Sequence, residues 1–318
     1  MSECTYTSPS GLRCTETASQ DGLCFWHAHT DKKSPDLKKE LETKAKNGDN
    51  LSGFNLVGAN LSDAYLMWAD LSTADLSRAD LSLGHFFGIN LSHASLFKAN
   101  LTGANLKEAN LENANLLGAD LTGVNLERVT WGKGQKITNH QEADALSAQG
   151  ESEPAKTKYL EAEEIYRNIR KCYEAAGTSD IAGQFFYNEM VVKRKLMPKF
   201  SSERIWSRLI DLLCGYGEIP YRIIGSSVTY ILTNALIFSA MGLFHNGQVY
   251  TFNTAHSFTE HLEFFGNAIY FSIVTFTTLG YGDFSPVSWA RPFAAIEGFV
   301  GAFMIALFIL SFVKKMTR

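Results

Sequence analysis

The most regular pattern in the chain is a leucine at every fifth position, running from Leu51 to Leu126 with Phe86 as its one substitute. Small residues, mostly alanine, stand two places before these leucines. A period of five fits neither the 3.6-residue period of a helix nor the two-residue period of a strand, so each unit has to turn a corner. The pattern predicts stacked coils over residues 49–130, with leucine and alanine inside.

Helical spacing replaces this period in residues 154–200. Apolar residues there recur at three- and four-residue intervals, and residues 176–180 have the composition of a tight turn. The pattern predicts a hairpin of two helices that resembles one tetratricopeptide-like unit. Residues 131–153 are polar and rich in glycine, which predicts a linker, and the charged residues 31–48 indicate a short helix or a linker.

Two apolar stretches of about 20 residues, 223–244 and 292–313, are long enough to cross roughly 30 Å of hydrocarbon. Residues 201–222 precede them and include an amphipathic segment suited to the membrane surface. Lysine and arginine are absent from residues 245–290 and occur on the outer flank of each apolar stretch. The positive-inside rule therefore predicts a multi-pass inner-membrane protein with both termini in the cytoplasm.

Composition and net charge exclude some classes of partner and segment but do not indicate a function. The 318 residues carry a formal net charge of −4, and their mean hydropathy of −0.09 averages a polar first part with an apolar last third. No nucleic acid is expected as a partner, because no excess of basic charge is present. Residues 1–30 lack the apolar core of a secretory signal.

Three of the five cysteines lie near the N-terminus and form, with a histidine, a candidate metal site: Cys4, Cys14, Cys24 and His27. Thiolates and an imidazole suit tetrahedral zinc, and metal binding would supply the folding energy that so small a segment lacks. We expect structural zinc in residues 1–30, although His29 competes with His27 as the fourth ligand. The alternative is a disordered tail with free thiols. Cys172 and Cys214 stand alone and are expected to pack as small apolar residues.

The segment between the apolar stretches contains Thr-Thr-Leu-Gly-Tyr-Gly-Asp, residues 277–283. A potassium filter replaces the hydration shell of the ion with backbone carbonyls, and glycines permit the backbone angles this requires. Together with its position between two apolar stretches, the segment resembles the filter of two-helix prokaryotic potassium channels. The resemblance implies an α-helical pore domain over residues 223–318 with a re-entrant loop, and a homotetramer, because one chain supplies one filter strand.

The same resemblance implies roles for individual residues. The filter would consist of Thr278, Leu279, Gly280, Tyr281 and Gly282. Residues expected to support it are Tyr270, Thr277, Asp283 and Glu297. The inner helix would have its hinge at Gly301 and line the cavity with Ala302, Ile305 and Ile309. Val274 stands where some bacterial channels have a glutamate, so inactivation of that kind is not expected.

Residues 49–130 resemble the pentapeptide-repeat family, whose pattern is A-(D/N)-L-x-x. This resemblance implies a right-handed quadrilateral β-helix with one repeat per side. The whole chain is thus expected to be a multidomain potassium channel, transporting K⁺ across the lipid bilayer and assembled or regulated through the repeats. A cytoplasmic ligand or protein partner of the repeats is not identified by the sequence.

Enzyme motifs are not found: the chain has no Walker loop, dinucleotide fingerprint, hydrolase elbow or metalloprotease helix. We therefore expect no enzymatic activity. The alternative function is a membrane-anchored pentapeptide scaffold or topoisomerase-binding protein with a vestigial pore. The glycines of the filter argue against it, because a vestigial pore has no need of them.

Overall fold

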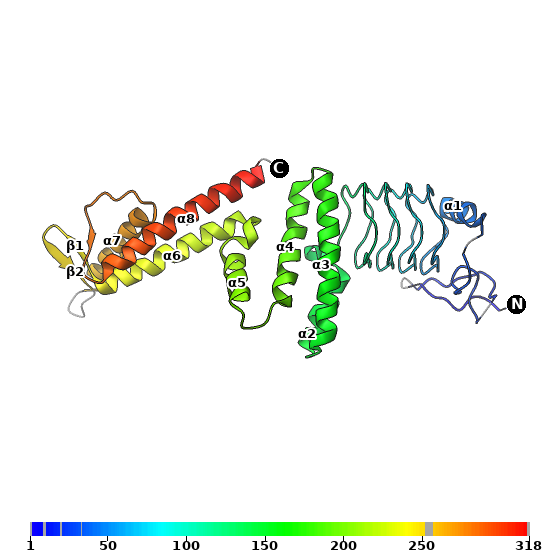
Figure 1. Ribbon diagram of the computed structural model, residues 1–318, viewed down its shortest axis with the longest axis horizontal. Helices are drawn as coiled ribbons and strands as arrows, with labels where there is room; N and C mark the ends of the chain where they lie inside the picture. The colour runs from blue at the N-terminus through cyan, green and yellow to red at the C-terminus, as the bar shows by residue number, and fades with distance from the viewer. Residues whose placement is uncertain (1, 9–10, 20, 33, 252–256, 317–318) are drawn as a thin grey trace. The chain divides into compact units, whose positions relative to one another are not determined.

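The computed structural model describes residues 2–8, 11–19, 21–32, 34–251 and 257–316. The chain divides into two compact units, Met1–Lys199 and Phe200–Arg318, and each is described by itself (Figure 1). Unit 1 contains the repeats and unit 2 the two apolar stretches.

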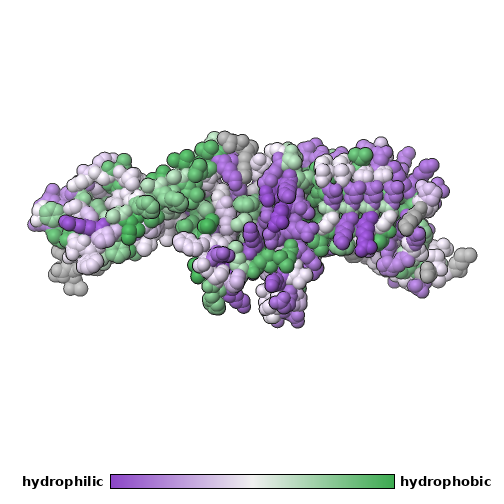
Figure 2. Space-filling model, viewed as in Figure 1, coloured by the Kyte–Doolittle hydropathy of each residue, from purple (hydrophilic) through white to green (hydrophobic). Residues whose placement is uncertain are grey.

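The repeats of unit 1 form parallel coils in which four five-residue units complete one coil. Parallel bridges join residues 20 apart, from Asn55 and Asp75 to Asn110 and Thr130. The leucines and alanines of the pattern are buried along the whole length, as the period of five predicts. Polar residues cover the coils on the outside, in rows that Figure 2 shows in purple. The handedness of the coil stays a prediction.

The first coil is covered by the N-terminal segment and by α1 (Leu37–Asn47). Leu37 and Leu41 are buried in the same core as the repeats, and Lys38 Nζ donates to the carbonyl of Ser62 at 2.7 Å. Of the two alternatives for residues 31–48, the structure has the helix. It covers leucines that the first coil would otherwise expose to water.

Three helices follow the last coil: α2 (Thr138–Ala148), α3 (Ser152–Ala175) and α4 (Ser179–Leu196), after a 3₁₀ turn at Lys133–Gln135. The hairpin of α3 and α4 agrees with the sequence, but the predicted linker 131–153 contains α2. This helix packs on α3 through Asn139, His140 and Ala143, all buried. Its buried face is largely polar, so it shows no amphipathic pattern in the sequence.

Unit 2 begins with α5 (Ser202–Cys214) and a 3₁₀ turn at Gly215–Gly217. Three longer helices follow: α6 (Pro220–Met241), α7 (Phe258–Phe276) and α8 (Ala290–Met316). A small antiparallel sheet of order β2-β1-β3 connects them, with β1 at Leu243–His245, β2 at Gln248–Tyr250 and β3 at Ser285–Pro286. The apolar stretch 223–244 thus ends as a helix at Met241, because the residues after Gly242 pair as a strand.

Among the described residues, α6 and α8 are the two helices long and apolar enough to cross a membrane. Only 28% and 17% of their most apolar windows are buried within the chain, so their hydrophobic faces point outward (Figure 2). A helix from the core of a soluble protein would be mostly buried. The exposure of both helices therefore favours lipid or other protein chains as their surroundings.

Candidate pore and metal centre

The segment predicted as the filter begins where α7 ends. A capping box of Ser257 and Glu260 starts this helix, and its last residue is Phe276. Thr277 continues the turn, with its hydroxyl donating to the carbonyl of Ile273 at 2.7 Å. The backbone N–H of Leu279 still reaches back to the carbonyl of Val274 at 3.0 Å. The filter segment is thereby fixed to the C-terminal end of a helix.

The backbone of this segment has a positive φ at every second residue: 59° at Thr278, 57° at Gly280 and 80° at Gly282. An ordinary strand points successive carbonyls to opposite sides, and a change of handedness at alternate residues turns them to one side instead. Glycine adopts these angles without steric cost, whereas Thr278 is strained by roughly 1–3 kcal/mol. Such a backbone can present a row of carbonyl oxygens to a cation.

Filter residues have few contacts within one chain. Leu279 is 59% and Tyr281 67% exposed, and Gly280 and Gly282 are exposed as well. On α8, Ala302, Ile305 and Ile309 are also exposed. The structure therefore leaves the predicted pore-lining residues open toward solvent or further chains, and their roles stay predictions.

Behind the filter, two aromatic contacts hold the segment that follows it. Tyr270 and Asp283, which the resemblance to channels implies as supports of the filter, lie close enough to interact electrostatically. His245 Nδ1 lies 2.8 Å from the backbone carbonyl oxygen of Asp283, and its ring stacks on Phe284 at 4.2 Å. Phe284 also meets Tyr270 edge-on at 6.0 Å. His245 and Phe284 were not predicted as site residues, because their contact depends on the small sheet that brings β1 beside β3.

Glu297 lies fully buried in α8, and Ser272 of α7 donates a hydrogen bond to its carboxyl group. The Ser272 hydroxyl also lies 2.9 Å from the carbonyl oxygen of Ile231 in α6. Ser272 therefore joins all three long helices. The geometry is that of a structural contact between helices, and the predicted role of Glu297 as a support of the filter stays a prediction.

Gly301, predicted as a hinge, is a point of close helix approach. A Cβ atom at this position would lie 2.1 Å from the carbonyl oxygen of Phe276, the last residue of α7. Any side chain would push α8 away from the end of α7. The contact explains why a glycine stands here without requiring that the helix bend.

The N-terminal segment brings its four predicted ligands together: Cys4, Cys14, Cys24 and His27 offer ligand atoms within 4.8 Å of one another. Cys14 Sγ and Cys24 Sγ are 3.8 Å apart, and His27 Nδ1 is 3.1 Å from Cys24 Sγ and 3.6 Å from Cys4 Sγ. Tetrahedral zinc with bonds of about 2.3 Å separates two sulfur ligands by about 3.8 Å, so this set fits the metal. His29 instead bonds to Asn55 at 2.6 Å and lies outside the cluster.

The residues around His27 fix the tautomer and the charge state in which its ring can bind a metal. Its Nε2 lies 3.2 Å from the carbonyl oxygen of Ser52, which can only accept, so Nε2 carries the proton and the Nδ1 lone pair faces the thiols. Burial lowers the pKa of His27 and keeps the ring neutral. Burial, together with the neighbouring Cys24, raises the pKa of Cys14 to about 12. A divalent cation would offset the raised pKa of the thiol by stabilising the thiolate, and the neutral ring of His27 is already in the form that binds a metal.

Two family models match the chain. One, described as an ion channel, covers residues 227–318, and the other, described as pentapeptide repeats, covers residues 50–82 and 89–128 in eight copies. The chain is a pentapeptide-repeat protein with an ion-channel domain. The resemblances to an ion channel and to pentapeptide repeats are thereby confirmed. Residues 83–88 fall between the repeat matches, yet the bridges of His85 to Tyr65 and Asn105 carry the coil through them.

Solved pentapeptide-repeat proteins are similar to this chain over the repeats. One from Nostoc PCC 7120 is 33% identical, with 30% of this chain and 78% of that chain covered and a TM-score of 0.27. Rfr23 from the cyanobacterium Cyanothece 51142 is 48% identical over 25% of this chain and 57% of its own, with a TM-score of 0.17. One from the Arabidopsis thaliana thylakoid lumen is 30% identical over 30% and 57%, with a TM-score of 0.17. No curated protein matches the chain.

Proposed function

We propose that this protein is a potassium-selective channel formed by four copies of the chain around one axis. The observation that carries the proposal is the left-handed backbone at every second residue from Thr278 to Gly282, directly after the helix that lies between α6 and α8. One such strand covers one side of an ion, and four around an axis would surround it. The exposed faces of the filter and of α8 are the surfaces that these neighbours would meet.

In the proposed mechanism, the carbonyls of Thr278, Leu279, Gly280 and Tyr281 replace the water of the potassium ion, with the Thr278 hydroxyl at the innermost site. Asp283 would fix the outer end through its contacts with Tyr270 and His245. These contacts would restrain the filter backbone, so that its carbonyl oxygens could not move inward to coordinate a smaller ion.

The membrane topology is part of the proposal. With α6 and α8 spanning an inner membrane, the lysine- and arginine-free segment between them faces outward, and both termini are cytoplasmic. The pentapeptide coils would then lie in the cytoplasm, where they assemble or regulate the pore. The exposed apolar residues of α5, Ile205, Trp206 and Ile210 among them, suit the membrane surface.

Zinc is proposed as the metal of the N-terminal cluster, with Cys4, Cys14, Cys24 and His27 as its ligands. The metal would supply no reaction. It would fix the N-terminal segment on the first coil, since His27 already stacks on Tyr6 and bonds to Ser52.

Potassium flux from liposomes containing the purified protein tests the proposed channel. Flux should require the protein and fall more than roughly tenfold in Gly280→Ala, because a side chain is strained at a φ of 57°. Gly266→Ala is the matched control, as a Cβ at this position in α7 meets open space. Absence of flux from correctly inserted protein would favour the membrane-anchored scaffold instead.

A further inference from the structure

The last coil of the β-helix has an edge that is only partly paired. In the coil before it, the N–H groups of three residues donate to the next coil at 2.9 Å, in the pairs Lys98–Leu117, Leu101–Asp120 and Gly103–Thr122. In the last coil, the N–H groups at the equivalent positions, 20 residues later in the chain, belong to Gly118, Leu121 and Gly123. These have no backbone partner among the residues that the structure describes.

The acceptor of this edge is open as well. Asp120 N–H donates to the carbonyl of Ala99 at 3.0 Å, whereas the corresponding carbonyl of Ala119 accepts no backbone N–H from the described part of the chain. The next corner is closed by α3, because the carbonyls of Val124 and Leu126 accept from Cys172 Sγ at 3.4 Å and from the Tyr173 hydroxyl at 3.0 Å. The N–H groups of Leu116, Leu126 and Arg128 also lack a backbone partner in the described part of the chain, but they lie outside residues 118–124, the side of the coil that lines a groove.

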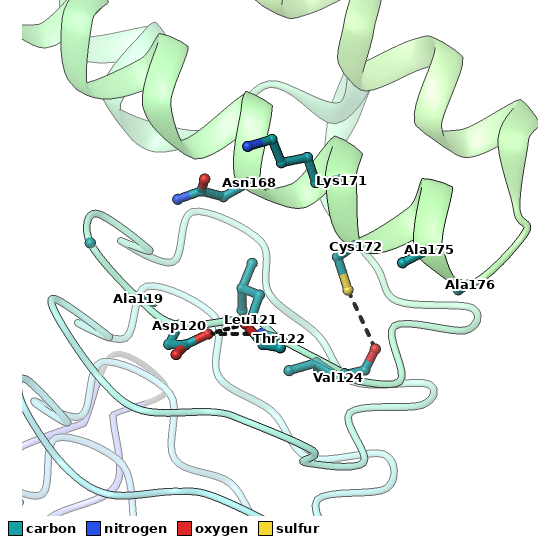
Figure 3. Close-up of a pocket in the computed structure, with 12 residues that line it drawn as sticks. Ala119, Asp120, Leu121, Thr122, Val124, Asn168, Lys171, Cys172, Ala175 and Ala176 are labelled. Atoms are coloured by element: carbon teal, nitrogen blue, oxygen red, sulfur yellow. Dashed lines mark hydrogen bonds between the residues drawn. The ribbon is translucent and has the colours of Figure 1, made fainter.

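A groove of about 670 Å³ lies over this side. Residues 118–124 form its floor, and α3 forms its roof with Asn168, Lys171, Cys172 and Ala175 (Figure 3). Three donors and one acceptor thus lie in a groove at the spacing of a β-ladder. Unpaired edges of this kind are templates for a further strand.

We propose that this groove binds an extended peptide segment of a partner protein, which adds one side of a further coil to the β-helix. The peptide would run parallel to residues 118–123, with three carbonyls accepting from Gly118, Leu121 and Gly123 and one N–H donating to Ala119. A small-molecule ligand has no reason to match four backbone groups at ladder spacing, whereas a peptide backbone matches them all.

The coils below specify the preferred side chains. Asparagine amides stack along the outside, with Asn90 Nδ2 donating to Asp70 at 2.8 Å and Asn100 Nδ2 to Asp80 at 3.0 Å. Asp120 ends the row that contains Asp80 and Asn100, so the next residue in the row should be an asparagine. The residue before it would lie above Ala119 and should be small. The expected motif is therefore a small residue followed by asparagine and leucine.

The probe is an acetylated and amidated peptide with the sequence of residues 97–103, Phe-Lys-Ala-Asn-Leu-Thr-Gly, which occupy the equivalent position two coils below the proposed peptide. Its binding to the full chain in detergent is measured by fluorescence polarisation, and hydrogen exchange of residues 116–124 is followed by mass spectrometry. We expect saturable binding that slows exchange there, and loss of binding in Ala175→Trp, which fills the groove. Lys156→Trp, on the exposed part of the same helix, should bind as the parent does.

Two methylated peptides decide the mode of binding. Methylation of the asparagine nitrogen removes the hydrogen bond to Ala119 and should weaken binding roughly tenfold. Methylation of the leucine nitrogen, which points away from the edge, should weaken it less than about twofold. The proposal is overturned if both peptides bind equally, if exchange of residues 116–124 does not change, or if Lys171→Ala alone abolishes binding, which would indicate an ionic site. Binding does not depend on ion conduction, so this test and the flux measurement can fail separately.

Discussion

At the scale of single residues, two glycines of α8 approach the C-terminal end of α7 at different distances. A Cβ at Gly301 would lie 2.1 Å from the carbonyl oxygen of Phe276, whereas one at Gly298 would lie 3.5 Å from that of Thr275, an ordinary contact. Small residues at helix interfaces permit close backbone approach within membranes. Substitution of each glycine can therefore show whether Gly301 is needed for close packing of the helices or for bending of α8.

Gly301→Ala should destabilise the ion-channel domain by about 1–3 kcal/mol, because the methyl group forces α8 away from α7. The thermal midpoint of the detergent-solubilised protein measures the effect, and Gly298→Ala should leave it nearly unchanged. If Gly301→Ala retains full stability and alters only the open probability, the glycine is a hinge and not a packing contact.

Zinc content tests the N-terminal cluster residue by residue. Elemental analysis should find about one zinc per chain in the parent protein, and Cys14→Ser or His27→Ala should remove most of it because three ligands hold the metal far less tightly. His29→Ala should keep the metal, since that ring bonds to Asn55. Retention of zinc in His27→Ala together with its loss in His29→Ala would assign the fourth ligand to the other histidine.

Residues near in sequence were the easier ones to predict. The cysteines and His27 lie within 24 positions, and their residue types alone indicate a metal. His245 and the Asp283 carbonyl lie 38 positions apart and meet through a three-stranded sheet of very short strands. No local pattern marks such strands, so this support of the filter could not be predicted.

At the scale of elements, the sequence predicts those that follow a repeated pattern and misses those that do not. The stacked coils could be predicted because every unit repeats one local pattern, and the 20-residue spacing of the bridges corresponds to four units per coil. Helix α2 was missed because its buried face carries Asn139 and His140, which do not follow an apolar period. A polar residue becomes part of a core only through its partners, here the Tyr166 hydroxyl 2.9 Å from His140 Nδ1.

His140 should make the stability of unit 1 depend on pH. Burial lowers its pKa from 6.5 to about 4, so the unfolded chain takes up a proton at a pH where the folded one does not. The free energy of unfolding is unaffected above about pH 6.5 and falls as the pH drops toward 4, by a total of about 3 kcal/mol.

Thermal midpoints of the parent protein and of His140→Gln between pH 7.5 and 4 measure this contribution. The parent should lose more stability over this interval than the variant does. Acid release of zinc affects both proteins equally, so the difference between them isolates the histidine. Parallel curves would mean that folding does not lower the pKa of His140.

At the scale of the whole molecule, the ion-channel domain leaves large apolar surfaces exposed in one chain. Its filter segment is exposed, and α6 and α8 present apolar faces outward. The sequence could indicate this through the resemblance to channels that assemble from four chains. It could not indicate the groove at the end of the β-helix, which depends on where α3 leaves the last coil uncovered.

Native mass spectrometry in detergent should find four chains per particle. Removal of residues 1–199, which form a compact unit of their own, should leave the tetramer intact if the ion-channel domain alone assembles it, and should change the open probability if the repeats regulate it. Monomers or dimers of the full chain would contradict a fourfold filter. An unchanged open probability would contradict regulation by the repeats.

The most direct test of the account is the reversal potential of the purified protein in planar bilayers with a potassium gradient and an opposite sodium gradient. Alternating backbone handedness from Thr278 to Gly282 predicts carbonyl sites fitted to potassium, so the reversal potential should lie close to the potassium equilibrium potential and move with the potassium gradient. A reversal potential that follows sodium as closely as potassium would contradict it.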